Sequence, residues 1–189
     1  MDILYRIRAI LIGVIVYRKA KIDDKEDIAK LLRRVSTSAT YESILFPIPP
    51  ISEEKIAPAI VNGEMFVAKD RRSILALGIV KMDVSSYFFP VTHDGGKLMN
   101  IMSKTDSRMS EDVLSLAYLA VDPLYQRRGI GSEMLSFLEA RFARFLLVSS
   151  LDISNQKGIE FLRKNGFKKV DLEEFEFSPR KQQLLFKRL

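Results

Sequence analysis

The sequence contains no cysteine and a single histidine among its 189 residues. The missing cysteines exclude disulfides, thiolate metal sites and cysteine nucleophiles. One histidine also disfavours a zinc site built entirely from protein ligands, so we expect no resident metal. Asparagine and glutamine are scarce beside lysine, arginine and glutamate, a composition typical of proteins from heat-adapted organisms.

Long hydrophobic runs and long runs of one charge are missing as well. The apolar run at residues 9–16 is too short to cross a bilayer, and no small-residue cleavage site follows it. We therefore expect a cytoplasmic protein without membrane attachment. The net charge is +6, but the basic residues form scattered pairs, which indicates a solvated surface rather than a nucleic-acid site.

The length suits one sizeable core, and the chain shows no repeat and no internal linker. We expect an N-terminal extension over residues 1–13 and a single α+β domain over residues 14–189. Polar, irregular residues at 83–112 predict a long loop. Apolar spacing predicts the elements in this order: a buried strand at 9–16 that extends towards residue 21, helices at 24–36 and 52–62, a hairpin of strands 65–68 and 74–82, a strand at 113–121, a helix at 129–144, a strand at 145–151, a helix ending at 165–166, and strands at 167–172 and 183–186.

The rest of the chain is organised around residues 113–144. An apolar run there ends at the Asp-Pro pair 122–123, and Gln-Arg-Arg-Gly-Ile-Gly-Ser at 126–132 then opens a helix. Such a turn directs unpaired N–H groups and a helix N-terminus towards one point, which attracts phosphate. The two glycines permit a close backbone approach, and the two arginines add positive charge. The alternative is a tight strand-to-helix connection.

Residues 119–132, LAVDPLYQRRGIGS, resemble the acetyl-coenzyme A motif of the GNAT N-acetyltransferases, whose core is Q/R-x-x-G-x-G/A. A second segment, Asn155 followed by GIEFLRKNGF at 158–167, is similar to that family's Asn-x-x-Ala…Tyr-x-x-x-Gly-Phe segment. The resemblance covers about residues 14–189. It implies the three-layer GNAT-like fold: a mixed, mostly antiparallel sheet with one splayed strand pair and helices on both faces.

The resemblance also implies acetyl-coenzyme A as co-substrate. Leu119, Ala120 and Val121 would pair with the pantetheine arm, and the strands at 113–121 and 145–151 would splay to admit the thioester. N–H groups of the turn would hold the diphosphate. Asn155 would contact the cofactor, although a helix cap is its simpler role. The expected cofactor-binding turn comprises Gln126, Arg127, Arg128, Gly129, Ile130, Gly131 and Ser132.

Three acid–base positions depart from the family pattern. The tyrosine that many members use as general acid falls at Leu162, and two glutamates fall at Ser150 and near Ser115. We name Asn155 and Tyr118 as catalytic candidates, with a core role as the alternative for Tyr118. Further candidates for the base, each with a surface role as alternative, are Glu111, Asp112, Tyr87 and His93.

These observations predict an N-acetyltransferase that moves an acetyl group from acetyl-coenzyme A directly to a primary amine. Direct transfer is expected because no cysteine can form an acyl-enzyme. A coenzyme A-binding sensor or interaction domain is the alternative, suggested by Leu162. A peptide N-terminus, a lysine and a small amine all remain open as acceptor, because the family builds acceptor sites from variable loops, here about 37–52 and 83–112. The sequence does not predict the oligomeric state.

Overall fold

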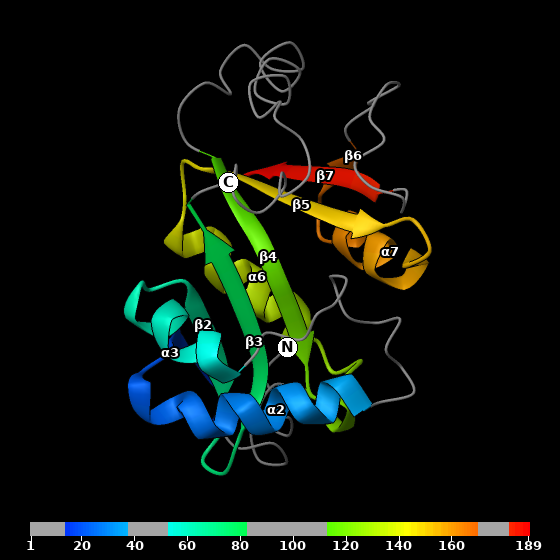
Figure 1. Cartoon of the computed structure of the whole chain (residues 1–189). Coiled ribbons are helices and arrows are strands. Elements are labelled where there is room, and N and C mark those ends of the chain that lie inside the picture. Colours follow the sequence, from blue (N-terminus) through cyan, green and yellow to red (C-terminus); the bar gives the residue numbers. More distant parts are fainter. Residues whose placement is uncertain (1–13, 38–52, 83–112, 170–181) are drawn as a thin grey trace. The chain divides into compact units, whose positions relative to one another are not determined.

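The computed structural model describes residues 14–37, 53–82, 113–169 and 182–189. Hydrogen bonds link seven strands in the order β1-β2-β3-β4-β5-β7-β6 (Figure 1). β4 and β5 run parallel, whereas β1–β2, β5–β7 and β6–β7 are antiparallel. The strands are β1 Val16–Lys19, β2 Met65–Lys69, β3 Ile74–Lys81, β4 Val113–Val121, β5 Leu146–Asp152, β6 Lys168–Lys169 and β7 Gln182–Arg188. The α-helices are α2 Lys25–Thr37, α3 Glu53–Val61, α6 Ile130–Arg141 and α7 Gln156–Lys164, with short 3-10 turns η1 Ile22–Asp24 and η3 Pro123–Tyr125. This is the mixed, mostly antiparallel sheet that the sequence predicts.

The chain divides into two compact units. The first contains the described residues 14–37, 53–78 and 119–137, and the second contains 79–82, 113–118, 138–169 and 182–189. β3, β4 and α6 each contribute residues to both units. The expectation of a single domain over residues 14–189 stays a prediction.

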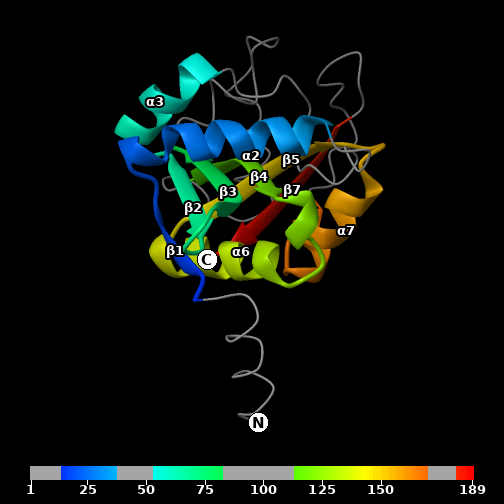
Figure 2. The ribbon, with the colours of Figure 1, turned by 90° about the horizontal axis from the view of Figure 1, so that it is seen from below.

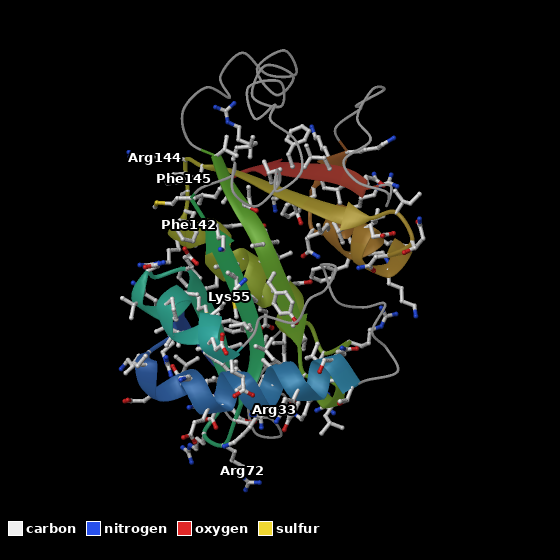
Figure 3. The ribbon with its side chains drawn as sticks, viewed as in Figure 1. Arg33, Lys55, Arg72, Phe142, Arg144 and Phe145 are labelled. Atoms are coloured by element: carbon white, nitrogen blue, oxygen red, sulfur yellow. The ribbon has the colours of Figure 1, made fainter. Side chains whose placement is uncertain are left out.

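In the first unit, α2 buries one apolar face. Its buried side chains recur at helical spacing: Ile28, Ala29, Leu31, Leu32 and Val35. Figure 2 shows α2 on one face of β2 and β3, with the beginning of α6 on the opposite face. β2 is buried except at its last residue, as expected for a strand covered on both faces. Arg33 and Lys55 extend from the exposed sides of α2 and α3 (Figure 3).

A buried carboxylate joins three elements of the first unit. The Asp24 side chain is 3% exposed and accepts two hydrogen bonds from the Arg18 guanidinium, at 2.7 and 2.9 Å. It also accepts from the Lys21 N–H at 2.8 Å and from Lys69 Nζ at 3.2 Å. The bonds from Arg18 hold the pKa of the Asp24 carboxyl well below its usual range, although burial acts in the opposite direction. These contacts tie β1 and β2 to the start of α2.

In the second unit, β5 pairs with β7 along its whole length, from Leu146↔Arg188 to Asp152↔Gln182. Lys187 Nζ donates to Glu139 Oε1 at 2.6 Å and to the Asn165 carbonyl at 2.8 Å. Through Lys187, β7 is therefore bonded to the last turn of α6 and to the C-terminal end of α7. At the end of α6, Phe142, Arg144 and Phe145 lie close together (Figure 3), and the two rings meet edge to face.

The sequence places most described elements within two residues of their observed bounds. The first strand is not buried as expected: Val14 is 70% exposed and Val16 is 49% exposed, because β1 is the edge strand of the sheet. The helix expected at 129–144 is also too long, since α6 ends at Arg141. The chain tightens there because the Phe145 N–H bonds to the Phe142 carbonyl and Arg144 takes φ +107°. Of the strand expected at 167–172, β6 comprises two residues, and the remainder from 170 lies outside the described residues, as do residues 1–13 and 83–112. No helix in the described ranges is both long and apolar enough to span a membrane.

Candidate functional site: the turn between β4 and α6

Asp122 fixes the point where β4 ends, and it is 2% exposed. Its N–H donates to the Leu75 carbonyl, and its own carbonyl accepts from the Tyr125 N–H, both at 2.8 Å. The side chain uses both oxygens: Oδ1 accepts from the Leu124 N–H at 3.0 Å, and Oδ2 accepts from Arg34 Nε at 2.8 Å. Asp122 thus caps η3 and anchors the turn.

The turn then adopts an unusual backbone. Arg127 has φ +62° and Gly129 has φ +88°, both in the left-handed region that side-chain-bearing residues rarely adopt. Gln126 Nε2 donates to the Val121 carbonyl at 3.2 Å and so ties the turn back to β4. Alternation of right- and left-handed residues turns successive N–H groups towards one side, which is how a backbone nest binds an anion.

α6 begins directly after this turn. The Gly129 carbonyl accepts the first helical bond, from the Glu133 N–H at 3.0 Å. The preceding N–H groups of an α-helix have no carbonyl partner within the helix. They lie at the positive end of the helix dipole, where a phosphate is stabilised. The predicted residues from Leu119 to Val121 and from Gln126 to Ser132 thus belong to one unit. Binding of an anion by the turn stays a prediction.

Charged side chains surround the turn. The Arg128 guanidinium lies 5.2 Å from the centre of the Tyr125 ring, a cation–π contact that holds it beside the turn. Glu133 adds a negative charge: a Cβ placed on Gly129 would lie 3.8 Å from Glu133 Oε1. Its Oε2 accepts from the Tyr17 hydroxyl at 2.6 Å. The turn therefore combines two arginines with one tethered carboxylate.

Asn155 belongs to the second unit and caps α7. Its Oδ1 accepts from the Gly158 N–H at 2.9 Å, and its carbonyl accepts from the Ile159 N–H at 3.0 Å. Gly158 makes this possible, because a Cβ there would lie 2.8 Å from Asn155 Nδ2 and 2.9 Å from a Leu151 methyl group. The cap, which is the simpler of its two roles, is therefore observed, and a cofactor contact stays a prediction.

β4 and β5 share only a short ladder in the part of the second unit that the structure describes. Its three register pairs run from Val113↔Leu146 to Ser115↔Val148, whereas β5 continues to pair with β7 through Asp152. A ladder that is shorter than both parallel strands is expected when the two strands diverge. Tyr118 lies on β4 and is 7% exposed, which agrees with the core alternative, and its catalytic role stays a prediction.

Two buried hydroxyls flank the end of this ladder. Ser115 and Ser149 are each fully buried, and neither Oγ has a hydrogen-bond partner among the described residues. Ser115 is the residue near which the resemblance would place a glutamate. Leu162, where the resemblance would place a tyrosine, is also fully buried and belongs to the core of α7. The departure from the family's acid–base residues at these positions stays a prediction.

Replacing Ser115 with alanine is expected to leave the free energy of unfolding unchanged or to raise it by up to about 1 kcal/mol, because an unsatisfied buried hydroxyl is removed. Chemical denaturation measures the change. Ser154→Ala is the control: Ser154 Oγ donates to Asp152 Oδ1 at 2.7 Å, so its loss should cost about 0.5–1.5 kcal/mol. A clear loss of stability in Ser115→Ala would show that the hydroxyl is bonded in solution.

Several expected residues fall outside the described part of the chain: Tyr87, His93, Glu111 and Asp112. The side chain of Ser150 is likewise not described. No local sequence pattern indicates that Arg34, Tyr17 and Glu133 are neighbours of the turn. The Asp-Pro pair signalled Asp122, but no local pattern connects it with a residue 88 positions earlier.

A family comparison agrees with this geometry. The model of the acetyltransferase (GNAT) domain matches residues 61–169, more than half of the chain. This range contains the turn between β4 and α6 and the α7 cap. A search of curated proteins found no match.

Solved structures share the fold. The PaiA N-acetyltransferase of Thermoplasma acidophilum, in complex with coenzyme A, is 18% identical with a TM-score of 0.62, covering 93% of this chain and 99% of that one. A GNAT-family acetyltransferase of Bacillus cereus is 19% identical with a TM-score of 0.61, covering 93% and 98%. The ribosomal-protein-S18-alanine N-acetyltransferase of Escherichia coli is 16% identical with a TM-score of 0.58, covering 92% and 91%. Taken with the family match, these findings show that the chain belongs to the GNAT acetyltransferase family.

Proposed function

We propose that the protein transfers an acetyl group from acetyl-coenzyme A to a primary amine. The observation that carries the proposal is the turn of the first unit, where left-handed Arg127 and Gly129 lead into the N-terminus of α6. A diphosphate is bound by convergent N–H donors without a bulky side chain at the closest approach, and left-handed residues directly before a helix N-terminus favour such a site. Family membership supports the acetyl donor, and the coenzyme A complex of a structural neighbour agrees with it.

In this proposal the backbone of the turn binds the diphosphate and orients the donor. N–H groups of β4 at Leu119–Val121 are candidates for holding the pantetheine arm. The amine nitrogen attacks the thioester carbonyl, a C–N bond forms, the C–S bond breaks, and the amine proton passes to solvent or to the thiolate. Positioning amine and thioester in line can lower the activation barrier by roughly 7–11 kcal/mol at the extreme. Transfer therefore depends less on a general acid, which Leu162 cannot provide.

A coenzyme A-binding sensor is the second candidate, and buried Leu162 favours it. An acetyltransferase converts acetyl-coenzyme A and an amine into products, whereas a sensor binds coenzyme A without converting it. The purified protein would be mixed with acetyl-coenzyme A and a panel of amines: a polyamine, a lysine-containing peptide and a peptide with N-terminal alanine. Thiol release together with acetylated product by mass spectrometry would identify the enzyme and its acceptor class. Coenzyme A binding without thiol release for any amine would favour the sensor.

Glu133→Gln is expected to strengthen coenzyme A binding about two- to fivefold, because the carboxylate beside Gly129 repels a diphosphate. A glutamine oxygen can still accept from the Tyr17 hydroxyl, so the contact between β1 and α6 is retained. Calorimetry at low and high salt measures the effect, which should shrink as salt screens it. Glu160→Gln, an equal charge change at an exposed position of α7, should leave affinity unchanged. Weaker binding in Glu133→Gln would contradict this role.

A further inference from the structure

Arg34 contacts the turn from a distant part of the sequence. It lies in the last turn of α2, and its Nε donates to Asp122 Oδ2 at 2.8 Å across 88 positions. The Asp122 side chain is 3% exposed, whereas the Arg34 side chain is 39% exposed. A buried carboxylate requires such a partner, because ionised oxygens removed from water are costly when left unpaired.

The two oxygens of the Asp122 carboxylate have different partners. Oδ2 is used by Arg34, which leaves Oδ1 for the Leu124 N–H and hence for η3. Without the guanidinium, the carboxylate would be free to rotate or to draw in water, and the cap on η3 would weaken. Asp122 lies five residues before Arg127, whose left-handed backbone persists only where its surroundings hold it.

Other ion pairs of the first unit lie elsewhere. Those of Asp24 and Asp27 join α2 and its start to β1 and β2, and Arg33 pairs with Glu53 at the start of α3. Of the ion pairs between described residues, the pair of Arg34 with Asp122 is therefore the one that reaches the turn. A purely structural pair is the simpler interpretation, but it does not explain why the pair attaches at this point.

We propose that Arg34 is a positioning residue for the cofactor: through Asp122 it holds the turn in its anion-binding conformation and so couples α2 to coenzyme A affinity. This inference rests on the proposed function. The effect should appear in the dissociation constant of coenzyme A and in KM for acetyl-coenzyme A, with little change in kcat, because Arg34 acts on the diphosphate end of the donor rather than at the thioester.

Arg34→Met removes the donor and keeps most of the side-chain length. We expect its coenzyme A affinity, measured by calorimetry well below the melting temperature, to fall about tenfold, the scale of one charge-assisted hydrogen bond. Arg34→Lys restores a cation and should recover part of this loss. Arg33→Met is the matched control, since Arg33 is the neighbouring residue on α2 (Figure 3), is exposed and pairs with exposed Glu53; it should bind as the wild type does.

The result separates the inference from the proposed function. Wild-type protein that binds no coenzyme A would overturn both. Wild-type binding with unchanged affinity in Arg34→Met, even at a lower melting temperature, would leave the function intact and reduce the pair to a structural one. Equal losses in the variants at Arg33 and Arg34 would also overturn the inference, because the effect would then be one of general charge.

Discussion

Gly129→Val is expected to weaken coenzyme A binding about 100-fold or more. Gly129 has φ +88°, where a side chain costs about 1–2 kcal/mol and a β-branched one is a genuine outlier. A Cβ would meet no neighbour closer than 3.8 Å, so the expected loss arises from the backbone and not from a clash. The turn would relax, and each charge-assisted hydrogen bond thereby lost removes about 1.5–3 kcal/mol.

Gly63→Val provides the matched control. Gly63 follows α3 with φ +77°, and a Cβ there would overlap the end of the Lys19 side chain, which is flexible enough to move aside. Both variants should lose stability through backbone strain, which thermal denaturation will measure. Calorimetry with coenzyme A should separate them, because only the change at Gly129 alters the turn. Wild-type affinity in Gly129→Val would contradict the assignment of the turn.

The second large effect concerns stability. Asp24→Ala is expected to lower the free energy of unfolding by about 3–5 kcal/mol, because it leaves Arg18 and Lys69 without their buried partner. Asp27→Ala is the control: the Asp27 side chain is 33% exposed and pairs with Lys30 and Lys69, so its loss should cost at most about 1 kcal/mol. Denaturant titration measures both.

The same carboxylate predicts a dependence on pH. The pKa of Asp24 lies well below its usual range in the folded protein, whereas in the unfolded chain an aspartate has a pKa of about 3.9. The unfolded state therefore binds the proton first as pH falls, and the stability that Asp24 contributes is present above about pH 4 and is lost below it. Asp24→Asn should be less stable than the wild type at neutral pH, and the difference should narrow below that pH. A constant difference would contradict the assignment.

Local patterns made much of the fold predictable. The buried positions of α2 recur at helical spacing, and the helix expected at 52–62 is observed as α3, Glu53–Val61. The overshoot at the end of α6 has a clear cause: Phe142 and Phe145 continue the apolar spacing after the helix has ended, because they pack on each other. Apolar periodicity reports burial, and it cannot tell a helix from a tight turn whose aromatic side chains are also partly buried.

The candidate site could be predicted from the sequence only in part. Its two glycines and two arginines could be found from the sequence, but the left-handed backbone of Arg127 could not, because a non-glycine residue gives no local signal for it. Arg34 was missed since its partner is distant in the sequence, and Tyr17 was missed for the same reason. The orphaned hydroxyls of Ser115 and Ser149 became visible only when their burial was known. The contacts of Arg34 and Tyr17 are tertiary, so no local pattern predicts them.

Amide hydrogen exchange with and without coenzyme A tests the central claim most directly, namely that backbone N–H groups between β4 and α6 hold the diphosphate. At saturating coenzyme A, exchange of the N–H groups from Arg127 to Ser132 should slow, whereas the turn between β2 and β3 should exchange at an unchanged rate. Unchanged exchange from Arg127 to Ser132, at a concentration where calorimetry shows the protein to be saturated, would contradict the account.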